Sequence, residues 1–299
     1  LYPLLIKGNV SFKSLIKFQV KRFFRLYPIH IFVLFVVLGI QVLKLISLKF
    51  FNLSSGKEAF TPDYWYTLID FFNHLFLVQA VIHNGYALSW NSAAWTISTE
   101  FYSYIVFGVI TLSSRNNRFI FICISVLFIY FFNDISLLTK PYINHLFLGC
   151  LKFFLSGCIF FFIYEQIKIR LNDIFFIVLI FLLAYFYLEH LKLDNILFCT
   201  IILLVAILKE DSLISKFLNF SPFVYFGAIS YSFYMIHQSV LYLYIQSLKF
   251  IFKVPFLYSD GIASNTGNVY YDTLITISYI VISAILASLM YRYIENKFR

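Results

Sequence analysis

Long runs of apolar residues recur along almost the whole chain, and they constrain its fold more than any other feature. Many of these runs hold about 17 to 24 residues, the length that an α-helix needs to cross the hydrocarbon core of a bilayer. Short polar stretches separate the runs. Because backbone groups inside a bilayer must be hydrogen-bonded within the protein, helices are the expected form. The pattern predicts an all-α, polytopic bundle of transmembrane helices.

Composition excludes a water-soluble protein. Hydrophobic residues make up 61% of the 299 residues and charged residues only 12%, against about 25% charged in soluble domains. A formal net charge of +9 is spread over many short loops, which favours membrane orientation over nucleic-acid binding. The four cysteines lie in apolar runs without CxxC spacing, so neither a disulfide framework nor a metal site is predicted.

The apolar runs predict about eight spans with both chain ends on the cytoplasmic side. The spans are expected at 26–47, 94–112, 119–133, 143–164, 173–189, 195–208, 223–247 and 271–293. Alternating the loops from a cytoplasmic start places all seven arginines inside, whereas the lysines outside are diluted by acidic residues. This asymmetry is the positive-inside signature and supports an even number of spans.

The chain is predicted to form one membrane-embedded domain over residues 1–299, with no soluble domain after the last span. Two outer segments are long. In residues 48–93, the apolar stretch from Phe71 to Ile82 is expected to lie along the membrane interface or to dip into it. Residues 248–270 contain Asp260-Gly261 and the polar run 265–268, which predict turns.

Arg22 and Arg25 form the first candidate site, just before the first predicted span. They are three residues apart, so they share one face of a helix. Two guanidinium groups at the cytoplasmic surface suit a pyrophosphate or a phosphomonoester. The pair also satisfies the positive-inside rule as an anchor to lipid headgroups, and on this feature alone that reading is favoured.

Glu100 is the second candidate, within the segment 91–102. It lies about six residues into a predicted span, and therefore about 9 Å below the outer edge. A carboxylate there costs on the order of 2.5–3.5 kcal/mol and needs a partner or a role. The alternative is a structural glutamate bonded to Ser98, Tyr102 or a neighbouring helix. For a carboxylate inside the membrane, we favour a functional role over a structural one.

His237 is the third candidate and is expected near mid-membrane, at a depth similar to that of Glu100. Tyr234 precedes it by about one helical turn. Composition leaves a functional histidine and a hydrogen-bonded core histidine equally open. At the end of the chain, Glu295 is expected to pair with Arg292, Arg299 or the arginines near residue 25. No chemistry is assigned to it.

Taken together and in this order, four segments resemble the acyltransferase-3 family of polytopic membrane acyltransferases. KRFFRLYP is similar to the family's RxxR-then-Tyr-Pro segment, and NSAAWTISTEFY to its Asn-x-x-x-Trp-Ser-Leu-Ser-x-Glu segment, with Thr96 in place of the usual Ser. GAISYSFYMIH resembles the late Gly-x-x-Ser-Tyr-x-x-Tyr-x-x-His segment, and YRYIENKFR the closing Ile-Glu-x-x-Phe-Arg. The four segments span nearly the whole chain.

The resemblance implies an O-acyltransferase that moves an acyl group, acetyl by default, from cytosolic acyl-CoA to a hydroxyl of a cell-surface or exported glycan or a lipid-linked saccharide. It implies donor-side roles for Arg22 and Arg25 and a catalytic role for Glu100. The implied location is a bacterial inner membrane. Residues implied to support the substrate or the structure are Asn91, Trp95, Ser98, Tyr102, Tyr231, Tyr234 and His237.

One departure from the family concerns its catalytic base. The family carries an Arg or Lys separated by ten residues from a catalytic His near its start. Here the corresponding position is Gln19 for His30 and Phe226 for His237, and no other histidine fits. The family also has about ten spans. The chain starts at Leu1 without an initiator Met, so we expect that N-terminal helices, and with them this histidine, are missing.

The main alternative is a transporter or flippase of a glycan or lipid-linked substrate without acyl chemistry. Intramembrane Glu100, His237 and Lys152 suit a proton or substrate path. Against this reading, the sequence has no internal repeat and no matching pair of broken Gly/Pro spans. A third reading is a membrane binding protein that has lost catalysis.

Overall fold

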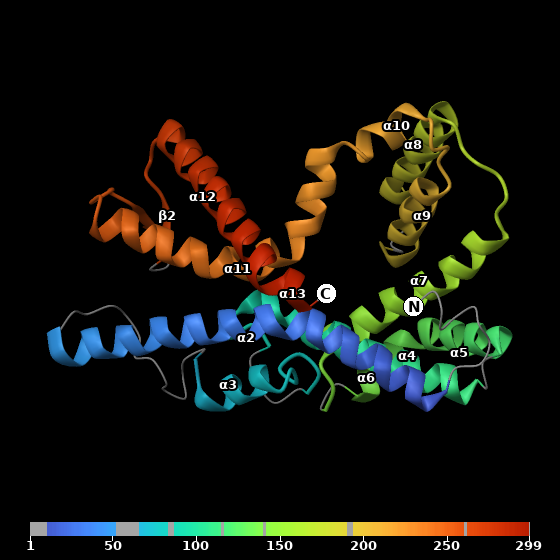
Figure 1. Ribbon diagram of the computed structural model, residues 1–299, viewed down its shortest axis with the longest axis horizontal. Coiled ribbons are helices and arrows are strands. Elements are labelled where there is room, and N and C mark those ends of the chain that lie inside the picture. Colours follow the sequence, from blue (N-terminus) through green and yellow to red (C-terminus); the bar gives the residue numbers. More distant parts are fainter. Residues whose placement is uncertain are drawn as a thin grey trace. The chain divides into compact units, whose positions relative to one another are not determined.

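The computed structural model describes residues 11–51, 66–82, 87–114, 117–139, 142–189, 194–259 and 262–298, and its regular structure is almost entirely helical (Figure 1). The predicted helical fold is therefore confirmed. The longer helices are α2 (Phe12–Phe51), α4 (Trp95–Ser113), α5 (Arg118–Tyr130), α7 (His145–Gln166), α8 (Asp173–Glu189), α9 (Asp194–Ala206), α11 (Ser221–Phe250) and α12 (Val269–Met290). The short helices are α3 (Leu68–Leu75), η1 (Ser92–Ala94), α6 (Phe132–Thr139), α10 (Leu213–Leu218), the π-helical turn η2 (Tyr291–Glu295) and α13 (Asn296–Phe298).

Each of the eight predicted spans overlaps one of the longer helices, but the first helix extends well before the first predicted span. Helix α2 begins at Phe12 rather than at residue 26. The basic residues before Arg25 lowered the hydropathy there, yet Lys and Arg are good helix formers, so they do not end a helix. Pro28 lies inside α2. It removes one backbone bond but does not interrupt the helix.

Three helices are long and apolar enough to cross a membrane, judged by length and composition over the described part of the chain. They comprise residues Phe12–Ser47, His145–Gln166 and Val269–Phe298. Three shorter apolar helices cover Arg118–Tyr130, Asp173–Tyr185 and Leu197–Ala206. The count of about eight spans stays a prediction.

The chain divides into two compact units, which are described separately. Unit 1 contains residues 1–20, 80–84 and 96–225, and unit 2 contains residues 21–79, 85–95 and 226–299. The prediction of one domain over the whole chain stays a prediction. The core of unit 1 is formed by buried side chains of α4, α5 and α7: Phe107, Phe121, Phe147, Leu148, Leu151, Leu155, Cys158 and Phe162. Edge-to-face ring contacts join Phe107 to Phe121 and Phe121 to Phe162, so phenylalanine packing holds these helices together.

A second part of unit 1 is fixed by backbone and carboxylate hydrogen bonds. The Leu171 N–H donates to the Ile207 carbonyl, and the Lys209 N–H donates to the Leu171 carbonyl, both at 2.8 Å. Asp173, at the start of α8, accepts from the Leu213 and Ile214 N–H groups at 2.9 and 3.0 Å. It therefore caps α10 as well, which supports a structural role for this acidic residue.

In unit 2, the short helix α3 lies beside α2 and is attached to it through backbone carbonyls (Figure 1). The last carbonyls of a helix lack partners within the helix. Here the Tyr27 hydroxyl donates to the Leu75 carbonyl at 3.0 Å, and His30 Nε2 donates to the His74 carbonyl at 2.9 Å. The Trp90 indole donates to the Thr67 carbonyl at the other end of α3.

Helix α3 buries two polar side chains and exposes apolar ones. Asp70 and His74 are buried together with Phe71, whereas Ile69 and Phe72, and Phe76 just after the helix, are exposed. This pattern is the reverse of that of a helix on a soluble protein and fits an apolar surrounding. It supports the predicted interfacial position of Phe71 to Ile82, although the helix itself ends at Leu75.

Acidic pH is expected to weaken the attachment of α3. Burial lowers the pKa of His74 to about 4 from 6.5, although its hydrogen bond to the Asp70 carbonyl acts in the opposite direction. The full stabilisation is present above pH 6.5. It is lost as pH falls from there toward about 4, because only the unfolded chain takes up the proton in that range.

The measurement is the thermal unfolding midpoint in detergent between pH 7 and pH 4.5, with His74→Gln as the comparison. The variant should show a flatter dependence on pH, since it lacks the titrating ring. His30 on α2 is the neighbouring titratable group, and it is retained in both proteins. Equal slopes for the two proteins would contradict the role assigned to His74.

Helices α11 and α12 form the other part of unit 2. The Tyr279 hydroxyl donates to the His237 carbonyl at 3.1 Å, and the hydroxyls of Tyr244 and Ser278 are 2.5 Å apart. Between the helices lies an antiparallel hairpin of β1 (Leu257–Ser259) and β2 (Ile262–Asn265), a short exception to the predicted all-α fold.

The turn predicted within residues 265–268 is present. Gly267 has a φ of 77°, and Asn268 accepts from the Tyr270 N–H as the N-cap of α12. A positive φ favours glycine, and asparagine is a preferred N-cap residue. The predicted Asp260-Gly261 turn lies outside the described residues.

Candidate functional site

Helix α11 carries one of the four candidate segments and is hydrogen-bonded to the other three within unit 2. The Tyr231 hydroxyl donates to the Leu26 carbonyl, one residue after Arg25, at 2.5 Å. Its neighbour Ser232 donates to Glu295 Oε2 at 2.7 Å. One turn further along, the Met235 carbonyl accepts from Asn91 Nδ2 at 3.1 Å. The fold therefore brings the segments that contain the arginine pair, Asn91 and Glu295 against α11, the helix that carries the late segment.

The arginine pair lies on α2 and is half-buried. Between the two arginines, the Phe24 ring stacks on that of Phe298, with centroids 6.5 Å apart and an interplanar angle of 7°. Leu26 is buried. The closing segment of the chain and α11 therefore pack against the same turn of α2, which orients this turn within unit 2. Arg299, the last residue of the closing match, lies outside the described residues.

Asn91 has a structural role that its burial requires. The side chain is 2% exposed, and its Oδ1 accepts from the Ala93 N–H as the N-cap of η1. The next residue, Ser92, donates its N–H to Gln238 Oε1 at 3.1 Å. A carbonyl acceptor for Nδ2 and a backbone donor for Oδ1 satisfy the buried amide. Trp95, the first residue of α4, is half-buried.

His237 and Tyr234 lie on α11, as predicted, and are one turn apart. His237 Nδ1 donates to the Tyr234 carbonyl at 2.6 Å, and the rings are 5.7 Å apart. This bond orients the imidazole ring and leaves Nε2 directed away from the backbone carbonyl. The side chain is half-buried rather than enclosed. The predicted depth shared with Glu100 stays a prediction.

Glu100 belongs to unit 1 and lies on the second turn of α4. Its Oε1 accepts a short hydrogen bond from the Tyr104 hydroxyl. The structural partners suggested from the sequence were Ser98, Tyr102 or a neighbouring helix, whereas this hydrogen bond comes from Tyr104 on the same helix. Ser98 is fully buried and accepts from the Ala80 N–H at 3.3 Å. Tyr102 packs at the margin of the phenylalanine core.

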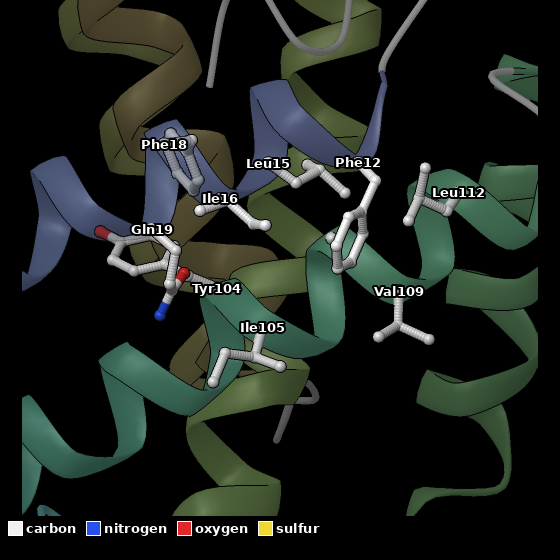
Figure 2. Close-up of a pocket in the computed structure, with 10 residues that line it drawn as sticks. Phe12, Leu15, Ile16, Phe18, Gln19, Tyr104, Ile105, Val109 and Leu112 are labelled. Carbon is white, nitrogen blue, oxygen red and sulfur yellow. The ribbon is translucent and has the colours of Figure 1, made fainter.

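An apolar pocket is lined in part by Tyr104, the hydrogen-bond partner of Glu100. Figure 2 shows Gln19 and Tyr104 at one end of the pocket. Phe12, the first residue of α2, and Leu112, near the end of α4, lie at the other end. The cavity volume is about 150 Å³, the size of an apolar cavity that holds benzene in another protein. Gln19 is oriented by donating to the Phe101 carbonyl at 3.1 Å. The pocket has room for a short acyl group, and Gln19 and Tyr104 are the polar side chains in its lining.

Two residues of the site were missed or given too small a role from the sequence. Tyr104 follows Glu100 by four residues, and this i, i+4 spacing was a usable signal. Glu295 was assigned to a salt-bridged helix end, but it is 1% exposed and bonded to Ser232. Its burial depends on packing against α11, so no local pattern in the sequence indicated it.

The family match decides the class of this site. Residues 4–292 match the sequence model of an acyltransferase domain, that of the acyltransferase-3 family. The chain belongs to the acyltransferase-3 family. Comparison with curated proteins and with solved structures returned no match. The apolar helices and the family together make this protein a membrane acyltransferase.

Proposed function

We propose that this acyltransferase moves an acyl group, acetyl by default, from cytosolic acyl-CoA to a hydroxyl of a cell-surface or exported glycan. The observation that carries the proposal is the set of contacts made by α11. Through Leu26, Glu295 and Asn91, it joins the segment with two arginines to two others from distant parts of the chain. These contacts hold the three segments around the turn of α2 that carries the two arginines.

The donor's phosphates are assigned to Arg22 and Arg25. A guanidinium group presents a planar fork that matches phosphate oxygens bidentately. The two arginines lie on one face of α2, and the contacts of Phe24 and Leu26 fix the turn that carries them. The proposed topology has both chain ends in the cytoplasm of a bacterium. It places this turn at the surface where acyl-CoA is available.

The reaction transfers the acyl group from the sulfur of CoA to the hydroxyl oxygen of the glycan. The hydroxyl oxygen attacks the thioester carbonyl, a C–O bond forms, the C–S bond breaks, and the hydroxyl proton is passed to the leaving thiolate. The family resemblance assigns the first proton transfer to a histidine. Glu100, held by Tyr104, orients or charge-balances that base. The pocket beside Tyr104 receives the acyl group.

Filling the pocket is expected to change the preference for acyl length. A Cβ at Gly108 would lie 3.4 Å from Leu15 Cδ1, so the side chain in Gly108→Leu must occupy the cavity. Turnover of hexanoyl-CoA should fall about tenfold relative to acetyl-CoA, since each displaced methylene is worth about 1–3 kcal/mol. The measurement is kcat/KM for the two donors.

Gly149→Leu is the matched control, because a Cβ at Gly149 on α7 meets nothing within 4 Å. It should leave the ratio of the two donors unchanged. An unchanged ratio in Gly108→Leu as well would remove the acyl group from this pocket.

Reconstitution in liposomes distinguishes acyl transfer from transport. The protein is given acetyl-CoA on one side and glycan from the source cells on the other. Release of free CoA together with acetylated glycan supports the proposal. Movement of glycan across the bilayer without CoA release would show a flippase instead.

A further inference from the structure

Glu295 lies where a charged side chain is costly and therefore informative. It is 1% exposed, within an apolar helical segment long enough to span a membrane. Ser232, which is fully buried, donates to Glu295 Oε2 at 2.7 Å. A neutral hydroxyl orients a carboxylate but does not balance its charge. A buried carboxylate is stabilised mainly by a nearby cation.

The backbone at this point is irregular in a way that turns Glu295 inward. Residues Tyr291–Glu295 form a π-helical turn between α12 and α13. Such turns are rare and occur frequently at functional sites. Around it, Tyr293 and Phe298 remain exposed, whereas Glu295 is enclosed. Glu295 is therefore the buried residue of the π-helical turn.

The segment beside Glu295 is the turn of α2 that carries the two arginines. Phe298, about one turn after Glu295, stacks on Phe24. Tyr231, adjacent to the Ser232 that holds Glu295, donates to the Leu26 carbonyl. These two contacts hold the segments on either side of Glu295 against α2 at positions 24 and 26, in the same helical turn as Arg25.

Among the described residues of the closing segment, the cations nearest to Glu295 in sequence, Arg292 and Lys297, are poorer partners because both are exposed. The guanidinium group of Arg292 lies over the Tyr293 ring, 5.8 Å from its centroid, and the Tyr293 ring is 57% exposed. Arg292 is therefore at the exposed side of the turn, away from the enclosed carboxylate. Arg22 and Arg25 are half-buried on a helix that packs against the same closing segment.

We propose that Glu295, held by Ser232, is a positioning residue that orients the Arg22–Arg25 pair for the phosphates of acyl-CoA. The inference rests on the proposed donor-binding role of these arginines. An arginine that is already oriented loses less conformational freedom when it binds a phosphate. The closing segment of the chain is thereby part of the donor site.

The test is a double-mutant cycle on the full chain in detergent, with CoA as the probe. Four proteins are compared: wild type, Glu295→Gln, the double variant Arg22→Ala/Arg25→Ala, and the triple variant. Glu295→Gln should weaken CoA binding about tenfold in the wild-type background. It should have less than about a twofold effect when the arginines are absent, because coupled residues are not additive. Glu165→Gln, which removes a carboxylate paired with Arg118, is the control and should bind CoA as the wild type does.

Each outcome is decisive for one of the two proposals. If the wild type does not bind CoA, the proposed function fails. If the wild type binds CoA and Glu295→Gln binds it equally or more tightly, the positioning role fails, since loss of a negative charge alone strengthens attraction for phosphate. An equal loss in both backgrounds would assign Glu295 a structural role only. If Glu295→Gln does not fold, Ser232→Ala is used in the same cycle, with an expected weakening of about threefold that again disappears without the arginines.

Discussion

In the complete protein, Glu100→Gln is expected to abolish acyl transfer while membrane insertion is unaffected. The amide retains the size of the side chain but cannot carry the negative charge that orients or balances the catalytic base. Loss of a residue with a general acid–base role costs about 10²–10⁴-fold in rate. The measurement is the rate of CoA release from acetyl-CoA in membranes that contain the source glycan.

Two further variants make this result specific. Tyr104→Phe removes only the hydroxyl that donates to Glu100 and should lower kcat by about tenfold, with little change in the KM for acetyl-CoA. Tyr130→Phe changes a tyrosine that is 78% exposed at the end of α5 and should leave both constants unchanged. Full activity in Glu100→Gln would remove this carboxylate from the mechanism.

Replacing Arg22 and Arg25 together by alanine is expected to raise the apparent KM for acyl-CoA on the order of 100-fold. Each hydrogen bond from a charged group contributes about 1.5–3 kcal/mol, and the double variant removes at least two toward the phosphates. The turnover number should change much less, because the arginines bind a part of the donor that does not react. Initial rates over a range of acetyl-CoA concentrations give both constants.

The matched control is Lys13→Ala with Lys17→Ala, which removes the same formal charge from exposed positions earlier on α2. A specific donor site predicts a small effect for the lysine pair and a large one for the arginine pair. Equal effects would indicate general electrostatic attraction, and an unchanged KM in the arginine variant would return these residues to lipid anchoring.

The helices themselves were predictable because their formation depends on local features of the chain. Apolar runs located all eight of the longer helices, and the polar run 265–268 indicated the turn before α12. The errors were local as well. Hydropathy excluded the basic first turns of α2, and the hairpin at 257–265 is too short to leave a periodic signal. A helix of alternating apolar and polar character such as α3 was expected only as an interfacial stretch.

The family and the identity of the candidate residues could also be predicted from the sequence, because the residues of each motif lie close together in the chain. Their partners were not. The bond between Tyr231 and Leu26 joins residues 205 positions apart, and that between Asn91 and Met235 joins residues 144 apart. Such pairs depend on which helix faces meet, and mean hydropathy is nearly equal on all faces of a helix surrounded by lipid.

The sequence alone therefore determined that this chain is helical, belongs in a membrane and carries the segments of an acyltransferase, since each property follows from local composition and spacing. Only the tertiary structure decided that Glu100 is bonded to Tyr104 beside an apolar pocket, and that Glu295 is enclosed against Ser232. Both depend on packing between segments. A buried carboxylate acquires its role from the groups that other helices bring to it.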